Sequence, residues 1–158
     1  MSALLLLTVL SSVFTGLIGG VFFAFSVFVV RALADLPPEQ GIAAMQRINV
    51  KVINPWFLGT FFGAVPLLAV AAYAAHGTDA PHALAWLSTA VLAHTVGSVG
   101  VTMVFNVPRN NRLAALAPAS SEAAVYWPVY VKEWLLWNHV RTVSSLLAAA
   151  GCVVAAAA

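Results

Sequence analysis

Four polar side chains recur at every fourth position of one otherwise apolar segment: His94, Ser98, Thr102 and Asn106. A spacing of four residues keeps side chains near one face of a helix, so these groups project toward a common neighbour. Polar groups are costly in hydrocarbon and normally face a partner or a cavity. An imidazole also changes its protonation near neutral pH. This face therefore predicts a functional site.

A second polar group lies in the last apolar segment. Asn138 and Arg141 are three positions apart and share one side of a helix, and His139 lies between them in the sequence. We expect these three residues to meet His94 and Asn106 in one cavity between the third and fourth apolar segments. This cavity would open toward the cytoplasmic side and the adjoining lipid.

Each polar residue also has a purely structural interpretation. Arg141 can pair with Glu133 or reach the phosphates of the inner leaflet. His139 can be satisfied by a neutral hydrogen bond to Asn106 or Thr102. The sequence leaves both interpretations open.

Composition determines the class of protein that must position these groups. The chain has 158 residues, of which 62% are hydrophobic and 8% are charged, and its mean hydropathy is +0.95. Soluble domains contain roughly 25% charged residues. Seven Lys and Arg residues against five Asp and Glu residues provide no basic face for nucleic acid. We therefore expect an integral membrane protein and no nucleic-acid partner.

Four apolar segments are long enough to cross about 30 Å of hydrocarbon. They cover residues of about 3–30, 56–75, 83–105 and 134–154. The predicted fold is all-α, an antiparallel four-helix bundle that forms a single transmembrane domain over residues 1–158. The first segment is too long for a signal peptide and should remain in the mature protein.

The first linker between spans predicts an additional helix. Pro37 and Pro38 can begin it, and Asn54 should end it because Pro55 disfavours a helical residue before it. Met45 falls on its apolar face. We expect this helix to lie along the inner membrane surface.

The second linker predicts another short interfacial helix, which Ser120 or Ser121 can cap and Pro128 can bend. The aromatic residues that follow are Trp127, Tyr130, Trp134 and Trp137. Such a belt typically anchors helices at the membrane interface. Its rings can also form the wall of a binding site.

Basic residues predict the orientation in the membrane. Every Lys and Arg lies in or near the two linkers, whereas the loop of residues 76–82 has none. By the positive-inside rule, the linkers face the cytoplasm and both termini lie outside. We expect a multi-pass protein of the plasma (inner) membrane.

Two sequence motifs resemble those of a known family. They are Phe-Asn-Val-Pro at 105–108 and Trp-Asn-His-Val-Arg-Thr at 137–142, with further similarity at 20–25, 45–49, 54–55 and 109–111. Nearly the whole chain is similar to the anthrone oxygenase-like family. Members of this family are small four-span membrane proteins. Fungal members act in aromatic polyketide pathways, where they oxidise an anthrone to an anthraquinone.

The resemblance implies an oxidoreductase, a monooxygenase that uses O2 on a hydrophobic aromatic substrate without a required cofactor. His139 would be the base or proton shuttle, and Arg141, Asn138 and Asn106 would stabilise the developing oxyanion. The expected substrate-binding residues are Trp134, Trp137, Thr102 and His94. The apolar bundle would admit the substrate from the lipid bilayer.

Two other classes of function remain open. In the first, His94 and His139 are ligands of haem or copper in a membrane redox protein. In the second, the chain is a non-catalytic membrane subunit, and the polar patch only fixes the helix register. The sequence does not decide whether the protein forms a homo-oligomer.

Overall fold

The computed structural model describes residues 2–78 and 81–158, and every regular element in these two ranges is helical. In chain order the elements are α1 (Ala3–Ala24), η1 (Phe25–Val29), α2 (Val30–Ala34), α3 (Pro38–Lys51), α4 (Pro55–His76), α5 (Pro81–Leu92), η2 (Ala93–Gly100), η3 (Thr102–Asn106), α6 (Val107–Ala114) and α7 (Ser121–Ala157), where η marks π-helical turns.

Four helical stretches of the described chain are long and apolar enough to cross a membrane: Ala3–Ala34, Pro55–His76, Pro81–Ala114 and Ser121–Ala157. The prediction of a helical membrane protein with four spans is confirmed. The stretches pack in a ring, in which α1 contacts α7 and α4, and α5 contacts α4 and α7.

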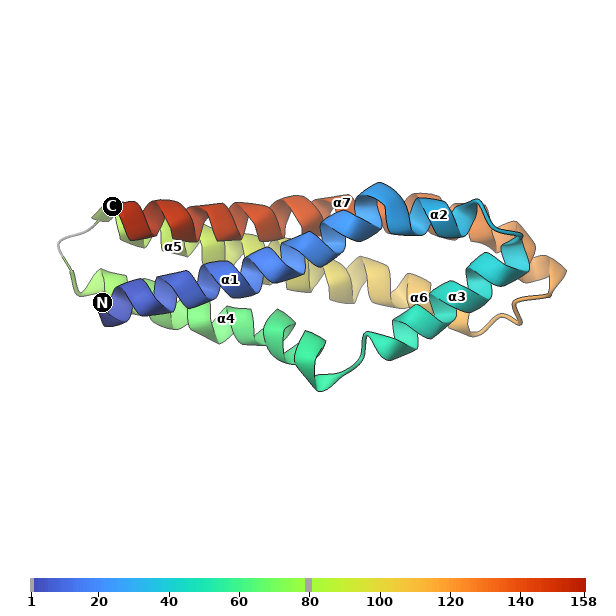
Figure 1. Ribbon diagram of the computed structural model, residues 1–158, viewed down its shortest axis with the longest axis horizontal. Helices are drawn as coiled ribbons and strands as arrows, with labels where there is room; N and C mark the ends of the chain where they lie inside the picture. Colours follow the sequence, from blue (N-terminus) through green and yellow to red (C-terminus); the bar gives the residue numbers. More distant parts are fainter. Residues whose placement is uncertain (1, 79–80) are drawn as a thin grey trace.

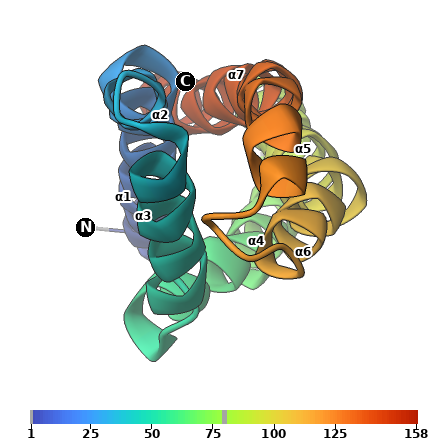
Figure 2. The ribbon, with the colours of Figure 1, turned by 90° about the vertical axis from the view of Figure 1, so that its right-hand side faces the viewer.

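The two ends of the bundle differ. Both termini lie at one end, which we call the terminal end (Figure 1). The other end, which we call the linker end, is formed by α2, α3, α6 and the beginning of α7, and Figure 2 looks onto it. The loop predicted to lie outside includes residues 79 and 80, which are outside the described residues.

Side-chain caps fix where two of the helices begin. Asn54 Oδ1 accepts a hydrogen bond from the Phe57 N–H at 3.0 Å, and Pro55 occupies the first turn of α4. Ser120 Oγ accepts from the Ala123 N–H at 3.1 Å at the start of α7. These contacts satisfy backbone donors that have no partner inside the helix. The sequence predicted the Ser120 cap, whereas α3 ends at Lys51, three residues before the end at Asn54 that was predicted.

The first linker helix begins where predicted but has different surroundings. The apolar face of α3, with Ile42 and Met45, is buried among protein side chains. In Figure 1, α3 folds back beside α2, and it also contacts α6 and α7. The expected place of α3 along the inner membrane surface stays a prediction. Leu113 and Trp127 provide apolar partners, so burial against protein satisfies the apolar face.

The second linker helix is continuous with the last span. α7 runs through Pro128 for 37 residues, without the separate short helix that was expected. Proline removes one backbone hydrogen bond, but the neighbouring Trp127 and Tyr130 are buried in the same apolar cluster as Met45. At about 1.5 Å per residue α7 is about 55 Å long, so one end extends beyond the hydrocarbon layer.

π-helical turns interrupt two of the four spans. η1 lies in the first span, and η2 and η3 lie in the third. In a π turn the backbone hydrogen bond joins residues five positions apart, and such wide turns occur frequently at functional sites. Phe25 of η1 and Thr102 of η3 line the cavity described below.

Candidate functional site

Arg141 places a guanidinium inside the bundle, where only 5% of the residue is exposed. Its Nη2 donates to Asn138 Oδ1 at 2.6 Å, and its Nη1 donates to Thr102 Oγ1 at 3.2 Å. The Nε atom is buried without a hydrogen-bond partner. In the described residues, 2–78 and 81–158, one ion pair is found, and it joins Arg109 to Glu133. The partners of Arg141 are therefore neutral.

Two aromatic rings hold this guanidinium. Arg141 Cζ lies 4.2 Å from the centroid of the Phe22 ring and 5.0 Å from that of Trp134. A cation over an aromatic face is attracted by the ring quadrupole, and more strongly where water is excluded. The rings therefore compensate part of the hydration that the charge loses.

Asn138 connects the guanidinium to the first span. Its Nδ2 donates to the Phe22 carbonyl at 2.8 Å and to Ser26 Oγ at 2.7 Å. Its Oδ1 accepts from Arg141, so both ends of the amide have partners. Ser26 Oγ also lies 3.0 Å from Thr142 Oγ1. This network fixes α7 against α1 and η1, and it fixes the position of the charge.

A cavity of about 400 Å³ lies beside Arg141 in the linker half of the bundle. α1, η1, α3, α4, η3, α6 and α7 all contribute to its wall, which is mostly apolar. The polar lining residues are Gln46, Asn49, Thr102, Asn110, Asn111 and Arg141. The volume falls in the range of about 300 to 1,000 Å³ that is typical of small-molecule pockets. Among the described lining residues there is no carboxylate and no histidine.

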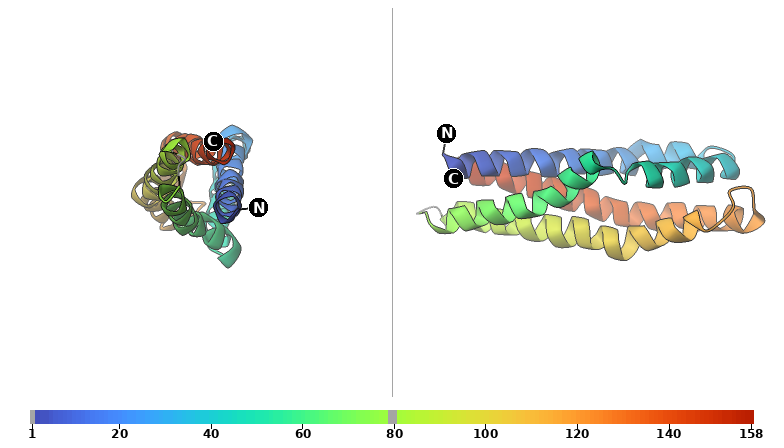
Figure 3. Two further views of the ribbon diagram at one scale, coloured as in Figure 1. Left: turned by 90° about the vertical axis from the view of Figure 1, so that its left-hand side faces the viewer. Right: turned by 90° about the horizontal axis from the view of Figure 1, so that it is seen from below.

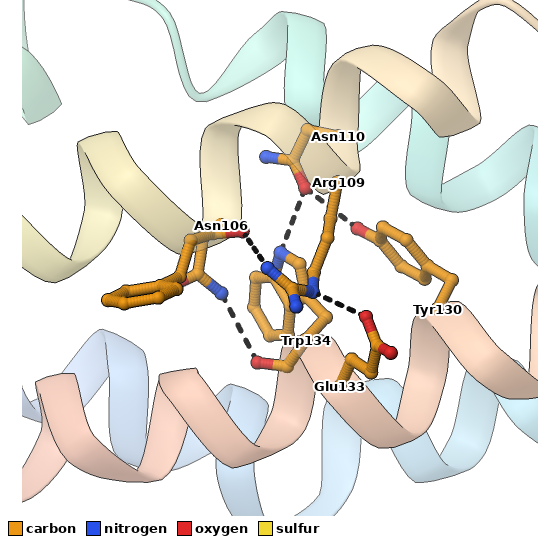
Figure 4. Close-up of polar contacts among 7 residues, drawn as sticks. Asn106, Arg109, Asn110, Tyr130, Glu133 and Trp134 are labelled. Atoms are coloured by element: carbon orange, nitrogen blue, oxygen red, sulfur yellow. Dashed lines mark hydrogen bonds and ion pairs between the residues drawn. The ribbon is translucent and has the colours of Figure 1, made fainter.

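Asn110 is a second polar residue on this wall, and Figure 4 shows its contacts. Its Oδ1 accepts from the Tyr130 hydroxyl at 2.9 Å and from Trp134 Nε1 at 2.8 Å. These bonds connect α6 to α7 at the linker end. Behind the wall, Asn106 Nδ2 donates to the Trp134 carbonyl at 3.2 Å. Trp134 is therefore held both by its ring nitrogen and by its backbone.

Glu133 is paired outside the cavity. Arg109 Nε donates to Glu133 Oε2 at 2.9 Å, and Arg109 Nη1 donates to the Phe105 carbonyl at 2.8 Å (Figure 4). The structural interpretation in which Glu133 neutralises Arg141 is therefore wrong. The charge of Arg141 remains available to a ligand.

A sequence profile of the family described as anthrone oxygenase matches residues 55–151. The chain belongs to the anthrone oxygenase family. The matched part runs from the beginning of α4 into α7 and includes Asn110, Asn138 and Arg141. No curated protein and no solved structure matches the chain.

In this anthrone oxygenase family member, several residues predicted from the sequence do come together. Arg141, Asn138 and Thr102 are joined by hydrogen bonds, and Trp134 lies against the guanidinium. Asn106 is buried and contacts the backbone of Trp134, but it does not line the cavity, and its Oδ1 has no hydrogen-bond partner.

Two predicted site residues lie elsewhere. His139 is exposed and does not line the cavity. Consecutive residues of a helix point about 100° apart, so the inward direction of Asn138 turns His139 away. The ring of Trp137 stacks on Phe105, with the centroids 3.5 Å apart and the planes at 6°, and Trp137 is also absent from the cavity wall. The expectation that both residues face the cavity is wrong.

His94 is buried in the bundle, away from the cavity wall. Its Nε2 lies 3.0 Å from the Phe61 carbonyl oxygen, and its Nδ1 is buried without a partner. A carbonyl oxygen only accepts, so Nε2 carries the proton. Pro66 follows in the same stretch of α4, where a proline disturbs the backbone hydrogen bonds. His94 thus cross-links η2 to α4 at this point.

The two histidines do not fit haem or copper as joint ligands. Ser98 and Ser145 are hydrogen-bonded at 2.9 Å and mark one level of the antiparallel η2 and α7. In η2, His94 lies four residues from Ser98, toward the terminal end. In α7, His139 lies six residues from Ser145, toward the linker end. They are therefore about 15 Å apart along the bundle. No group of three or more metal-ligating side chains occurs in the part of the chain that the structure describes.

The position of the cavity also differs from the prediction. The third and fourth spans pack closely in the middle of the bundle, where Gly97 lies directly on Ser144 and Ser98 bonds to Ser145; both spans line the cavity only nearer the linker end. The Pro55 end of α4 instead lies away from α1, whereas the other end of α4 lies beside α1 (Figure 1). The cavity forms where the spans separate, and α3 closes part of it.

The sequence did not single out the amide side chains of the linker end as site residues. Gln46, Asn49, Asn110 and Asn111 line the cavity. One signal was present in the pattern. Asn49 follows Met45 by four positions, so it falls on the apolar face of α3, where a polar side chain needs a partner.

Proposed function

We propose that this protein is a membrane monooxygenase that uses O2 to oxidise a planar, hydrophobic aromatic substrate of the polyketide type. The observation that supports this most strongly is the buried guanidinium of Arg141, which has neutral partners at the wall of an apolar cavity. Such a charge favours a ligand that becomes anionic there. Family membership provides independent support.

An anthrone illustrates the chemistry. Its carbon C10 is a CH2 group opposite the C9 carbonyl, and loss of one C10 proton gives an enolate with charge on the C9 oxygen. C10 then forms a bond to O2, and protonation gives a hydroperoxide. Loss of the remaining C10 proton forms the C10 carbonyl, breaks the O–O bond and releases hydroxide, which leaves as water. Anthrone and O2 thus become anthraquinone and water, so one oxygen atom enters the substrate.

Arg141 would stabilise the enolate oxygen in this sequence. Its hydrogen bonds to Asn138 and Thr102 fix the guanidinium before the substrate arrives, so little reorganisation accompanies the appearance of the charge. The described lining offers no carboxylate or imidazole, so the C10 proton is transferred to water. The role that the sequence suggested for His139 as the base is not part of this proposal.

The substrate itself supplies the electrons that reduce O2, so the proposal requires no cofactor. The cavity wall includes hydrophobic side chains that are exposed at the outer surface of the bundle, such as Ile53 at 70%, Val50 at 68% and Met103 at 53%. These groups support entry of an apolar substrate from the surrounding lipid. The expected location is the plasma membrane, with the linker end toward the cytoplasm.

Oxygen consumption by the purified protein tests this function. In detergent with anthrone as substrate, the parent protein should consume O2 and form anthraquinone, which mass spectrometry identifies. Arg141→Ala should lower kcat by about 10² to 10³-fold, as expected for loss of an oxyanion donor. Arg112→Ala is the matched control, because Arg112 lies over the Tyr126 ring and does not line the cavity.

Two results would contradict the proposal. The first is equal oxygen uptake by the parent and Arg141→Ala, which would remove the guanidinium from the reaction. The second is a parent protein that turns over neither anthrone nor hydroxylated anthrones. In that case, haem or copper at a stoichiometric level would favour a redox protein, and an inert stoichiometric complex would favour a membrane subunit.

A further inference from the structure

The amide of Asn110 has a fixed orientation. Trp134 Nε1 only donates hydrogen bonds, so the atom that faces it at 2.8 Å must be the oxygen of Asn110. The Tyr130 hydroxyl donates to the same oxygen. Rotation of the amide by 180° would bring its N–H groups against the indole N–H, which is unfavourable. The Asn110 NH2 group therefore points away from both residues, as Figure 4 shows.

This NH2 group is a hydrogen-bond donor without a protein partner among the bonds found in the described chain, and Asn110 lines the cavity. The neighbouring Asn49 also lines the cavity, and its Nδ2 is buried without a hydrogen-bond partner. Asn49 faces the Tyr130 hydroxyl, so the donor that remains for a ligand is the NH2 group of Asn110. Asn110 is half-buried, and an oxygen acceptor on the ligand would satisfy this group.

Trp134 lies between this donor and the guanidinium. Its indole nitrogen bonds to Asn110, and its ring centroid is 5.0 Å from Arg141 Cζ. One donor thus lies over the face of the indole ring and the other lies at its Nε1 edge. A planar ligand beside Trp134 can place one oxygen at Arg141 and a second oxygen at Asn110.

From this arrangement we infer that Asn110 binds the oxygen that enters the substrate, while Arg141 binds the oxygen already present. The inference rests on the proposed function. In an anthrone the reacting carbon C10 is opposite the C9 oxygen, so a C9 oxygen at Arg141 directs C10 toward the other donor. The Asn110 N–H then donates to the hydroperoxide oxygen bound to C10, and it keeps this contact when the O–O bond breaks and the same oxygen becomes the C10 carbonyl oxygen.

Comparison of two ligands isolates this contact. Anthrone has one oxygen, whereas anthraquinone has two on opposite edges of the same ring system. Dissociation constants for both are measured without O2 through quenching of tryptophan fluorescence. The variants are Asn110→Asp, which keeps an acceptor for Tyr130 and Trp134, and Asn110→Leu, which removes the polar group. In both variants we expect affinity for anthraquinone to fall about 3 to 10-fold relative to affinity for anthrone, as for loss of one neutral hydrogen bond.

Asn54→Asp is the matched control, because Asp also caps a helix and residue 54 does not line the cavity. The inference is overturned if the ratio of the two affinities stays at the parent value in both Asn110 variants, or if the parent binds neither ligand. A merely structural role of Asn110 would weaken both ligands equally and leave the ratio unchanged.

Oxygen uptake separates this inference from the proposed function. If the parent oxidises anthrone and both Asn110 variants match it in kcat and in the affinity ratio, the inference fails and the function stands. The other outcome is a parent protein that does not oxidise anthrone, although the ratio of the affinities for anthraquinone and anthrone changes in the Asn110 variants. In that case the proposed function fails, and Asn110 remains supported as a hydrogen-bond donor to the ligand.

Discussion

At the scale of single residues, the sequence predicted which side of its helix Arg141 occupies, but not all of the residues that it contacts. The spacing of three residues placed it on the same side as Asn138, and the two are hydrogen-bonded in the structure. Its expected ion pair with Glu133 also fitted the sequence. That pair is replaced by a contact between Glu133 and Arg109 of another helix. A contact across helices depends on how they are rotated, which the spacing within one helix does not determine.

The imidazole of His139 leads to a clear prediction. Because this side chain is exposed and absent from the cavity wall, His139→Ala should keep oxygen uptake within about twofold of the parent. Loss of a general base would slow a reaction about 10² to 10⁴-fold. Initial rates over a range of anthrone concentrations distinguish these outcomes, and a hundredfold loss in a folded variant would return His139 to the mechanism.

At the scale of elements, α3 closes the cavity because it packs closely on α2. A Cβ atom at Gly41 would collide with the Leu33 carbonyl oxygen and lie 3.1 Å from the Trp127 ring. A backbone oxygen cannot turn aside as a side chain can. The glycine therefore permits the contact that holds α3 against the linker end. The pattern of apolar residues predicted the helix but not this close approach.

Gly41→Ala tests the contact. We expect the substitution to destabilise the fold by about 1 to 3 kcal/mol, as is typical of an overpacked site. Thermal unfolding in detergent, followed by circular dichroism, measures the effect. Gly59→Ala is the control, since a Cβ there meets nothing within 4 Å. Equal midpoints for the two variants would show that α3 is not held by this contact.

The π turns explain why the third span was harder to predict in detail. In a regular α-helix, a repeat of four residues drifts by about 40° at each step, which amounts to about 120° from His94 to Asn106. Yet His94, Ser98 and Asn106 are all buried. The wide turns of η2 and η3 compensate this drift. Apolar periodicity contains no signal for such turns.

At the scale of the whole molecule, charge and topology agree with each other. The basic residues are Arg31, Arg47, Lys51, Arg109, Arg112, Lys132 and Arg141. Six of them lie in α2, α3, α6 and the first third of α7, whereas Arg141 lies near the middle of α7. Both termini lie at the end opposite the linkers. The number of spans followed from composition and segment length. The common end of the termini followed from an even number of spans, so neither depended on side-chain packing.

Cysteine labelling measures the orientation in the membrane. In a Cys152→Ala background, Thr78→Cys should react from outside the cell with a reagent that does not cross the membrane, because positive residues favour the cytoplasmic side. Asp35→Cys, at the linker end, should react only after the membrane is opened. The reverse pattern would place the linker end and its cavity outside.

The wide turns of the third span also determine how the length of the chain can change. Val101 lies between η2 and η3. Without it, Asn106 would follow His94 by eleven positions, which in a regular α-helix is about 20° more than three full turns. Loss of one residue could therefore be absorbed by a return of the π turns to α-helical turns, with both side chains still on one face. Insertion of one residue would instead place the two side chains thirteen positions apart, about 140° out of phase in a regular α-helix.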